Sequence, residues 1–215
     1  MRLRNKPWIA QAIHEYEDIV IFSPDKIQPG GWRTFFGTDQ PVHVELGAGK
    51  GDFITGMAKR WPNINFVGIE YEAAILYYAA KKVREQGLTN IRLLPFDGTD
   101  IGQLFSPGEI ERLYINFCDP WPKKRHAKRR LTDAGFLAKY KSVLQKGGAV
   151  YFKTDNERLF EYSLNQFAAN GFILANISLD LHNYGDVTDN VMTEYEKKFS
   201  SQGMKIFRCE AYLPV

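Results

Sequence analysis

The sequence predicts an α/β fold, in which a mostly parallel seven-stranded sheet carries helices on both faces. Three observations support this fold. Short apolar stretches alternate with segments of helical period, a glycine-rich turn follows the first of these stretches, and an acidic residue lies at the end of several of them. The 215 residues, 44% of them hydrophobic, suffice for one such domain. We expect residues 1–35 to form an N-terminal arm or lid and residues 36–215 to form the main domain.

The strands and helices follow from periodicity and from residues that end regular structure. Residues 42–46 alternate in polarity before the glycine turn, and residues 73–85 place apolar side chains on one helical face. Thr132 is a candidate helix cap, and Gly147 and Gly148 are expected to end that helix. The expected strands are 42–46, 65–70, 91–94, 112–117, 149–154, 172–179 and 205–213. The expected helices are 52–60, 73–85, 133–146 and 157–169.

An acidic residue lies at or just beyond the end of each of the first five expected strands. These acids are Glu45, Glu70, Asp97, Asp119 and Asp155. One acid at such a place is typically a helix cap or a turn residue, but five in series are harder to explain in that way. Because ligands of open α/β sheets bind at the carboxyl ends of the strands, these acids indicate a binding site.

The glycine-rich turn indicates a site for an adenosine cofactor. Gly47, Gly49 and Gly51 allow the backbone to approach a ligand closely, and Glu70 suits the two hydroxyl groups of a ribose. Alone, such a turn is a weak signal, and the same layout would serve a dinucleotide. Here the spacing is Gly-x-Gly-x-Gly, whereas the dinucleotide motif is Gly-x-Gly-x-x-Gly.

Two acids favour S-adenosylmethionine as the cofactor. Glu45, just before the turn, would repel a pyrophosphate but suits a ligand that carries an ammonium and a sulfonium. Asp97 is then placed to accept a hydrogen bond from the adenine amino group.

A nicotinamide-dependent oxidoreductase is a distant alternative, because no catalytic Tyr–Lys or Cys–His arrangement stands out. The two cysteines, Cys118 and Cys209, match no metal spacing, so we expect no metal.

A basic run beside an aromatic corner indicates binding to a nucleic acid. The net charge of +3 is modest, but six of the eight residues from 123 to 130 are Lys or Arg. An isolated charge run is usually a solvated face. This one directly follows Asp119-Pro120-Trp121-Pro122, where the carboxylate suits a base edge and the ring can stack on a base or wedge the loop.

These motifs resemble those of the bacterial tRNA (guanine-N7-)-methyltransferase family. The resemblance runs from about Val42 to the C-terminus. It rests on the segments 45–51, 68–70, 116–131, 152–155 and 193–199, of which the Asp-Pro-Trp-Pro-basic segment is the most specific. Two positions depart from the family pattern: Cys118 stands where proline is usual, and Ala127 where a second histidine is usual. Neither departure removes a carboxylate or a cationic side chain.

The resemblance implies a Rossmann-like class I S-adenosylmethionine-dependent methyltransferase that acts on N7 of the variable-loop guanosine at tRNA position 46. Guanine N7 has an in-plane lone pair and no proton, so the reaction needs no general base. The family match places Asp119 at the reaction centre and at the cofactor, where it would position the base and stabilise developing charge. It also implies substrate-binding residues, which are Lys123, Asp155, Thr193, Glu194, Tyr195 and Glu196. The implied RNA-binding residues are Arg125, His126, Lys128, Arg129 and Arg130.

Several alternatives stay open on the sequence alone. Asp155 could instead cap the following helix, and Thr193 with Glu196 has the spacing of a capping box. The chain could also be a methyltransferase for another base or a small molecule, or a non-catalytic RNA-binding protein. No apolar run is long enough for a membrane span, and no signal peptide follows the basic N-terminus, so we expect a cytoplasmic protein. Its expected partner is tRNA, without an obligatory protein partner, as a monomer or a homodimer.

Overall fold

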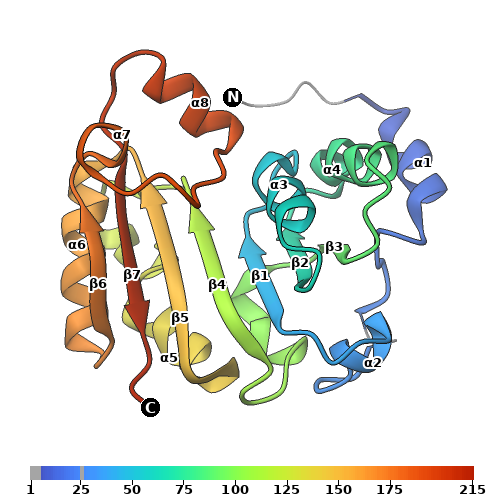
Figure 1. The fold of residues 1–215 in the computed structure, drawn as a ribbon, viewed down its shortest axis with the longest axis horizontal. Helices are drawn as coiled ribbons and strands as arrows, with labels where there is room; N and C mark the ends of the chain where they lie inside the picture. The colour runs from blue at the N-terminus through green and yellow to red at the C-terminus, as the bar shows by residue number, and fades with distance from the viewer. Residues whose placement is uncertain (1–5, 25–26) are drawn as a thin grey trace.

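The computed structural model describes residues 6–24 and 27–215 and contains one seven-stranded sheet (Figure 1). The strand order is β3-β2-β1-β4-β5-β7-β6; β7 runs antiparallel to its neighbours β5 and β6, and the pairs among β1 to β5 are parallel. The strands are β1 (Val42–Leu46), β2 (Asn65–Glu70), β3 (Ile91–Pro95), β4 (Ile110–Asn116), β5 (Leu144–Thr154), β6 (Ile173–Ser178) and β7 (Phe207–Tyr212). The predicted fold class is confirmed.

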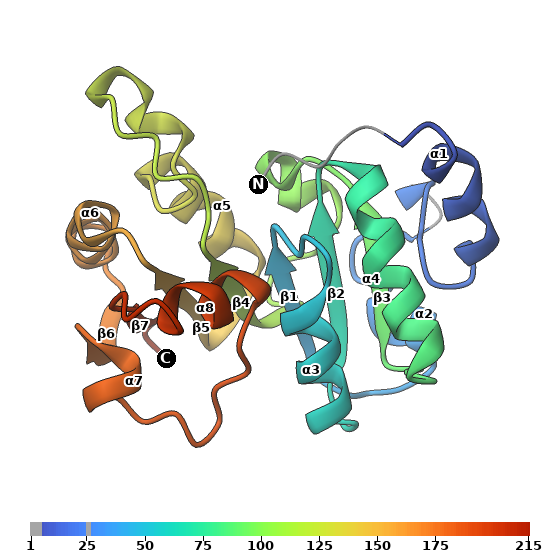
Figure 2. The ribbon, with the colours of Figure 1, turned by 90° about the horizontal axis from the view of Figure 1, so that it is seen from above.

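Helices cover both faces of the sheet and divide the core into two clusters. One cluster lies under α3 (Asp52–Arg60), α4 (Ala73–Glu85) and the N-terminal turns α1 (Ile9–Ala12) and η1 (Ile13–Tyr16). The other lies under η3 (Gly98–Gln103), α5 (Ala134–Val143) and α6 (Glu157–Ala169). Figure 2 shows α3 and α5 on opposite sides of the strands. In the described ranges, no helix is long and apolar enough to cross a bilayer.

The strand register brings the predicted acids to one edge of the sheet. Leu46 at the end of β1 pairs with Ile69 on β2 and with Ile115 on β4. The loops that follow these strands therefore leave the sheet at the same level. This edge also carries α8 (Glu194–Ser200), which lies above the ends of the strands in Figure 1.

The expected helix 133–146 is too long. The structure ends α5 at Val143, because Leu144 already pairs with Ile110 of β4 and so begins β5. The cap is also not the expected one: the Asp133 side chain accepts from the backbone N–H of Gly135, whereas the Thr132 hydroxyl is buried against Ser163 at 2.7 Å. Strand pairing therefore ends the helix earlier than the local signals predict, and the contact of Thr132 with Ser163 leaves the cap to its neighbour Asp133.

The described part of residues 1–35 packs against the β3 side of the sheet. Val20 forms a parallel bridge with Leu93 of β3. Trp32, in α2 (Trp32–Phe36), is fully buried and donates from Nε1 to the Leu104 carbonyl at 2.8 Å. The predicted division at residue 35 stays a prediction, and residues 1–5 and 25–26 of the predicted arm lie outside the described residues.

Gly51 has a packing role that predicts a large loss of stability on substitution. Its φ is +82°, and a Cβ there would lie 2.6 Å from the Cβ of Ala79 on α4. We expect Gly51→Ala to lower the free energy of unfolding by about 3 kcal/mol, combining the left-handed backbone cost with overpacking. Gly87→Ala is the matched control, because its φ is +62° with no atom within 4 Å of the added Cβ. Chemical denaturation would measure both, and equal losses would contradict the packing role.

Candidate active site

A pocket of about 460 Å³ opens at the carboxyl edge of the sheet, between the loops that follow β1 and β4. Its volume lies in the range of small-molecule sites. All of the predicted cofactor residues line it, together with Thr193, Glu194, Tyr195 and Lys198 of the α8 segment. The predicted residues among its walls are Glu45, Gly47, Gly49, Gly51, Glu70, Asp97, Asp119, Arg129, Thr193, Glu194 and Tyr195.

The glycine loop, residues 47–51, lines the part of the pocket that is predicted to hold the cofactor. Gly47 has a φ of +78°, and a Cβ there would meet no atom within 4 Å, so the loop leaves open space at this point. The Glu70 carboxylate accepts from the backbone N–H of Gly49 at 3.0 Å and from that of Glu72 at 3.2 Å. Asp97 accepts from the Thr99 N–H at 2.9 Å, where η3 begins. These bonds fix the two carboxylates at the pocket wall.

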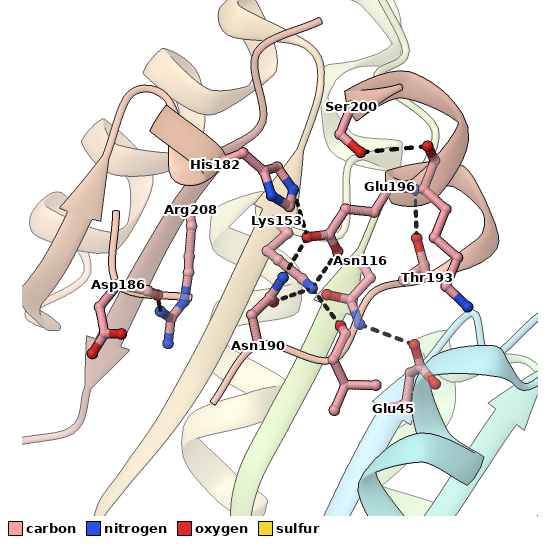
Figure 3. Close-up of polar contacts among 12 residues, drawn as sticks. Glu45, Asn116, Lys153, His182, Asp186, Asn190, Thr193, Glu196, Ser200 and Arg208 are labelled. Atoms are coloured by element: carbon pink, nitrogen blue, oxygen red, sulfur yellow. Dashed lines mark hydrogen bonds and ion pairs between the residues drawn. The ribbon is translucent and has the colours of Figure 1, made fainter. Parts of the chain in front are cut away.

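Glu45 is a buried carboxylate with one unsatisfied oxygen. Its Oε1 accepts from Asn116 Nδ2 at 3.0 Å, whereas Oε2 has no hydrogen-bond partner (Figure 3). Burial raises the pKa of Glu45 to about 8, although the Asn116 bond and the charge of Lys153 oppose the rise. A buried oxygen without a partner is costly, so this position suits a cationic group on a ligand. Asn116 was not among the predicted site residues, although it ends β4 beside the Asp-Pro-Trp-Pro segment.

The loop that carries Asp119 is held in an uncommon backbone conformation. Phe117 and Trp121 have φ values of 52° and 42°, in the left-handed region that few non-glycine residues adopt. The Phe117 N–H donates to the Lys153 carbonyl at 2.9 Å, and Arg130 donates to the carbonyls of Pro120 and Trp121. The exposed Asp119 thereby stands at the pocket wall on a braced loop.

The basic run lies beside the pocket, mostly outside it. Lys123 precedes η4 (Lys124–Arg129), on which Arg125 and Lys128 are exposed, while His126 is half-buried with its ring edge-on to Trp121. The Arg129 guanidinium lies over the Trp121 ring at 4.9 Å. Arg130 is turned back toward its own loop and over the Tyr162 ring at 4.3 Å.

Asp155 follows β5 and is half-buried, but it does not cap the next helix. The N-cap of α6 is Asn156, whose side chain accepts from the Leu159 N–H at 2.9 Å. The capping alternative for Asp155 is therefore wrong. Asp155 and Lys123 are not among the residues that line the pocket.

The capping-box spacing at α8 correctly predicts the role of Thr193 but not that of the Glu196 side chain. Thr193 is the N-cap and accepts from the Glu196 N–H at 2.9 Å. The Glu196 side chain is fully buried and lies 2.6 Å from Lys153 Nζ (Figure 3). Lys153 was also not predicted as a site residue. A lysine inside a buried strand is rare without a partner, and that was the signal available in the sequence.

Comparison with known proteins identifies the family. The profile of a family described as "Putative methyltransferase" matches residues 39–209. The chain is 53% identical to the tRNA (guanine-N(7)-)-methyltransferase of Geobacillus kaustophilus, covering 100% of this chain and 98% of the relative. It is 50% identical to the enzyme of that name from Bacillus subtilis, covering 98% of each.

Solved structures with low sequence identity share the fold. An antibiotic-related methyltransferase superposes with a TM-score of 0.64 at 18% identity, covering 90% of this chain and 95% of that one. The 16S rRNA methyltransferase KamB gives 0.65 at 12% identity, covering 88% and 95%. These two likenesses bear on the fold alone. From the family profile and the full-length relatives, the chain belongs to the tRNA (guanine-N(7)-)-methyltransferase family.

Proposed function

We propose that this protein transfers a methyl group from S-adenosylmethionine to N7 of the guanosine at position 46 in the variable loop of tRNA. The observation that carries the proposal is one pocket whose walls include both the glycine loop and Asp119. The exposed cations of η4 lie beside this pocket, where they suit the phosphates around an extruded nucleotide. Family membership supports the choice of substrate and base.

The residues on the cofactor side fit S-adenosylmethionine. Glu45 presents a buried oxygen without a partner, which suits the ammonium, and Glu70 suits the ribose hydroxyls. Asp97 suits the adenine amino group, and the open space at Gly47 leaves room for the ligand backbone. When bound, the cofactor supplies a methyl group on a sulfonium, and its sulfur keeps the electron pair of the broken bond as a neutral thioether.

Asp119 acts on the base rather than on a proton. N7 of guanine offers a lone pair in the ring plane, so alignment with the methyl group is the main requirement. The base becomes cationic as the new bond forms, and the Asp119 carboxylate stabilises that charge. Lys123, Asp155 and the segment from Thr193 to Tyr195 belong to the substrate side. A carboxylate facing N1–H and N2–H₂ of guanine would reject adenine, which offers an acceptor at N1.

The purified chain, unmodified tRNA transcript and methyl-labelled S-adenosylmethionine test the proposal. Nucleoside analysis is expected to find the label in 7-methylguanosine, and replacement of guanosine 46 is expected to abolish it. Label in another nucleoside would contradict the choice of base. Because no other protein is added, the same assay tests our proposal that no obligatory partner is needed. We place the reaction in the cytoplasm, because its substrate class is tRNA.

Cofactor affinity is expected to rise with pH because Glu45 must lose a proton. With its pKa raised to about 8 in the free protein, Glu45 is mostly protonated near neutral pH, and pairing with an ammonium requires the carboxylate. The Kd of S-adenosylmethionine should fall by up to about tenfold per pH unit between about pH 6 and about pH 7.5, with release of a proton. Above that range the amino group of the ligand itself titrates.

Calorimetry in buffers of different ionisation enthalpy measures this proton release. Glu45→Gln is the control, because it keeps the bond partner of Asn116 and cannot titrate. We expect weaker binding with no proton release for this variant. An unchanged proton release in Glu45→Gln would assign the titration to another group.

A further inference from the structure

Residues 185–200, here called the strap, cross the carboxyl edge of the sheet. They follow α7 (Leu181–Tyr184), pass beside α3 and return as α8 (Figure 2). On the α3 side, Arg60 donates to the Thr188 carbonyl at 2.8 Å and lies 2.7 Å from Asp189. Val191 packs on Gly56, where an added Cβ would lie only 2.6 Å from Val191 Cγ1. The strap therefore joins the α3 side of the sheet to the β5 side.

The β5 side of the strap is fixed by one buried cation. Lys153 Nζ contacts three acceptors, Glu196 Oε2 at 2.6 Å, Asn190 Oδ1 at 2.9 Å and the Val191 carbonyl at 3.0 Å (Figure 3). All three acceptors belong to the strap. The three donors of the ammonium are thereby all used, which is the arrangement in which a buried charge is tolerated.

The carboxylate of Glu196 is equally occupied. Oε1 accepts from Asn190 Nδ2 at 2.6 Å and lies 3.2 Å from His182 Nε2, while Oε2 takes the Lys153 ammonium. Glu196 is fully buried and does not line the pocket. Its neighbours in the strap, Thr193, Glu194 and Tyr195, do line it.

We propose that Lys153 and Glu196 are positioning residues, whose buried contact holds the strap as one wall of the pocket. This inference rests on the proposed function. It assigns Glu196 a role through Thr193, Glu194 and Tyr195, in place of the direct substrate contact expected from the sequence. The strap, which forms this wall, is about 40 residues distant in sequence from β5, and Lys153 joins the strap to β5.

The strap has a weaker attachment to the glycine loop, through Glu194 at the start of α8. Lys50 of the glycine loop pairs with Glu194 at 2.8 Å, but both side chains are partly exposed. Exposed ion pairs add little stability, whereas the Lys153 ammonium and the Glu196 carboxylate are both buried. Loss of Lys153 should therefore loosen the strap even though Lys50 and Glu194 remain.

Steady-state kinetics of Lys153→Met, Glu196→Gln and Asn190→Ala test the proposal. Lys153→Met and Glu196→Gln should each lower kcat by about tenfold or more, because both loosen the same wall of the pocket. They should also raise the KM for S-adenosylmethionine, because Glu194 of this wall pairs with Lys50 of the glycine loop. Asn190→Ala keeps the ion pair and should give a smaller change in the same direction. The Kd for tRNA, measured without cofactor, should stay within about twofold, since the exposed cations of η4 are untouched. Lys205→Met and Glu161→Gln, both at exposed positions, are the matched controls.

Limited trypsin digestion gives a readout that does not depend on activity. Cleavage after Lys197 and Lys198 of α8 should accelerate in Lys153→Met and Glu196→Gln, while cleavage within residues 123–130 stays at the wild-type rate. If Lys153→Met does not fold, Glu196→Gln and Asn190→Ala carry the same comparison. Unchanged cleavage at α8 in these variants would overturn the proposal.

The kinetic pattern separates the alternatives. Loss of kcat in Glu196→Gln alone, with Lys153→Met active and α8 protected, would mean that Glu196 contacts the substrate directly. A lower Tm in all three variants with unchanged KM and kcat would reduce the network to a stability role and overturn the positioning. A wild-type chain that forms no 7-methylguanosine would refute the proposed function, whereas the digestion would still report whether Lys153 holds the strap.

Discussion

Asp119→Ala is expected to lower kcat for methyl transfer by about 10²- to 10³-fold, the scale found when one preorganised group that stabilises a transition state is removed. Asp119 stands at the pocket wall between the left-handed residues Phe117 and Trp121, so the loop that carries its carboxylate is fixed before the substrate arrives. The charge that it stabilises appears only as N7 is methylated. The Kd of S-adenosylmethionine should therefore change by less than about threefold.

Two variants separate charge from shape at this position. Asp119→Asn keeps the side-chain size and should lose nearly as much kcat as Asp119→Ala, if the charge is what matters. Asp100→Ala, which removes an exposed acid of η3, should leave kcat unchanged. Single-turnover kinetics and equilibrium binding measure the two quantities separately. Parallel loss of cofactor binding and transfer in Asp119→Ala would assign Asp119 mainly to the cofactor pocket.

The cofactor half of the site could be predicted because it is local in sequence. Glu45, Gly47, Gly49 and Gly51 lie within one strand-turn-helix unit, where spacing alone fixes which groups meet. Glu70 is more distant, but it ends the neighbouring parallel strand, and the sheet topology brings it to the Gly49 N–H. The fold class could be predicted for the same reason, because the alternation of strands and helices is also a local pattern in the sequence.

The substrate half was harder, because its residues meet through tertiary contacts. The spacing of Thr193 and Glu196 predicts an N-cap, which the structure contains, but no local rule directs the Glu196 side chain to Lys153. The end of α5 was mispredicted for the same reason, because only the pairing of Leu144 with Ile110 fixes where β5 begins. Residues whose partners are far apart in the chain need the fold before their roles can be read.

Within the basic run, the role of Arg130 also depends on contacts made in the folded chain, and its substitution is expected to have a large effect on catalysis. Its Nε and Nη2 donate to the Trp121 carbonyl at 3.3 and 3.0 Å, and Nε also lies 3.1 Å from the Pro120 carbonyl. We expect Arg130→Met to lower kcat/KM by about ten- to a hundredfold, because the substitution removes charge-assisted bonds that hold the Asp119 loop. The salt dependence of tRNA binding should change little, since this guanidinium is turned toward its own loop.

Arg125→Met and Lys128→Met are expected to behave in the opposite way. Both side chains are exposed on η4, and removing one cation from the phosphates should lower the slope of log K against log salt by about 0.7 to 0.9. Their kcat at saturating tRNA should stay near the wild-type value. Filter binding over a range of salt concentrations, together with kcat, distinguishes the two classes. A shallower slope for Arg130→Met, with kcat retained, would place Arg130 on the phosphates and remove its role in bracing the loop.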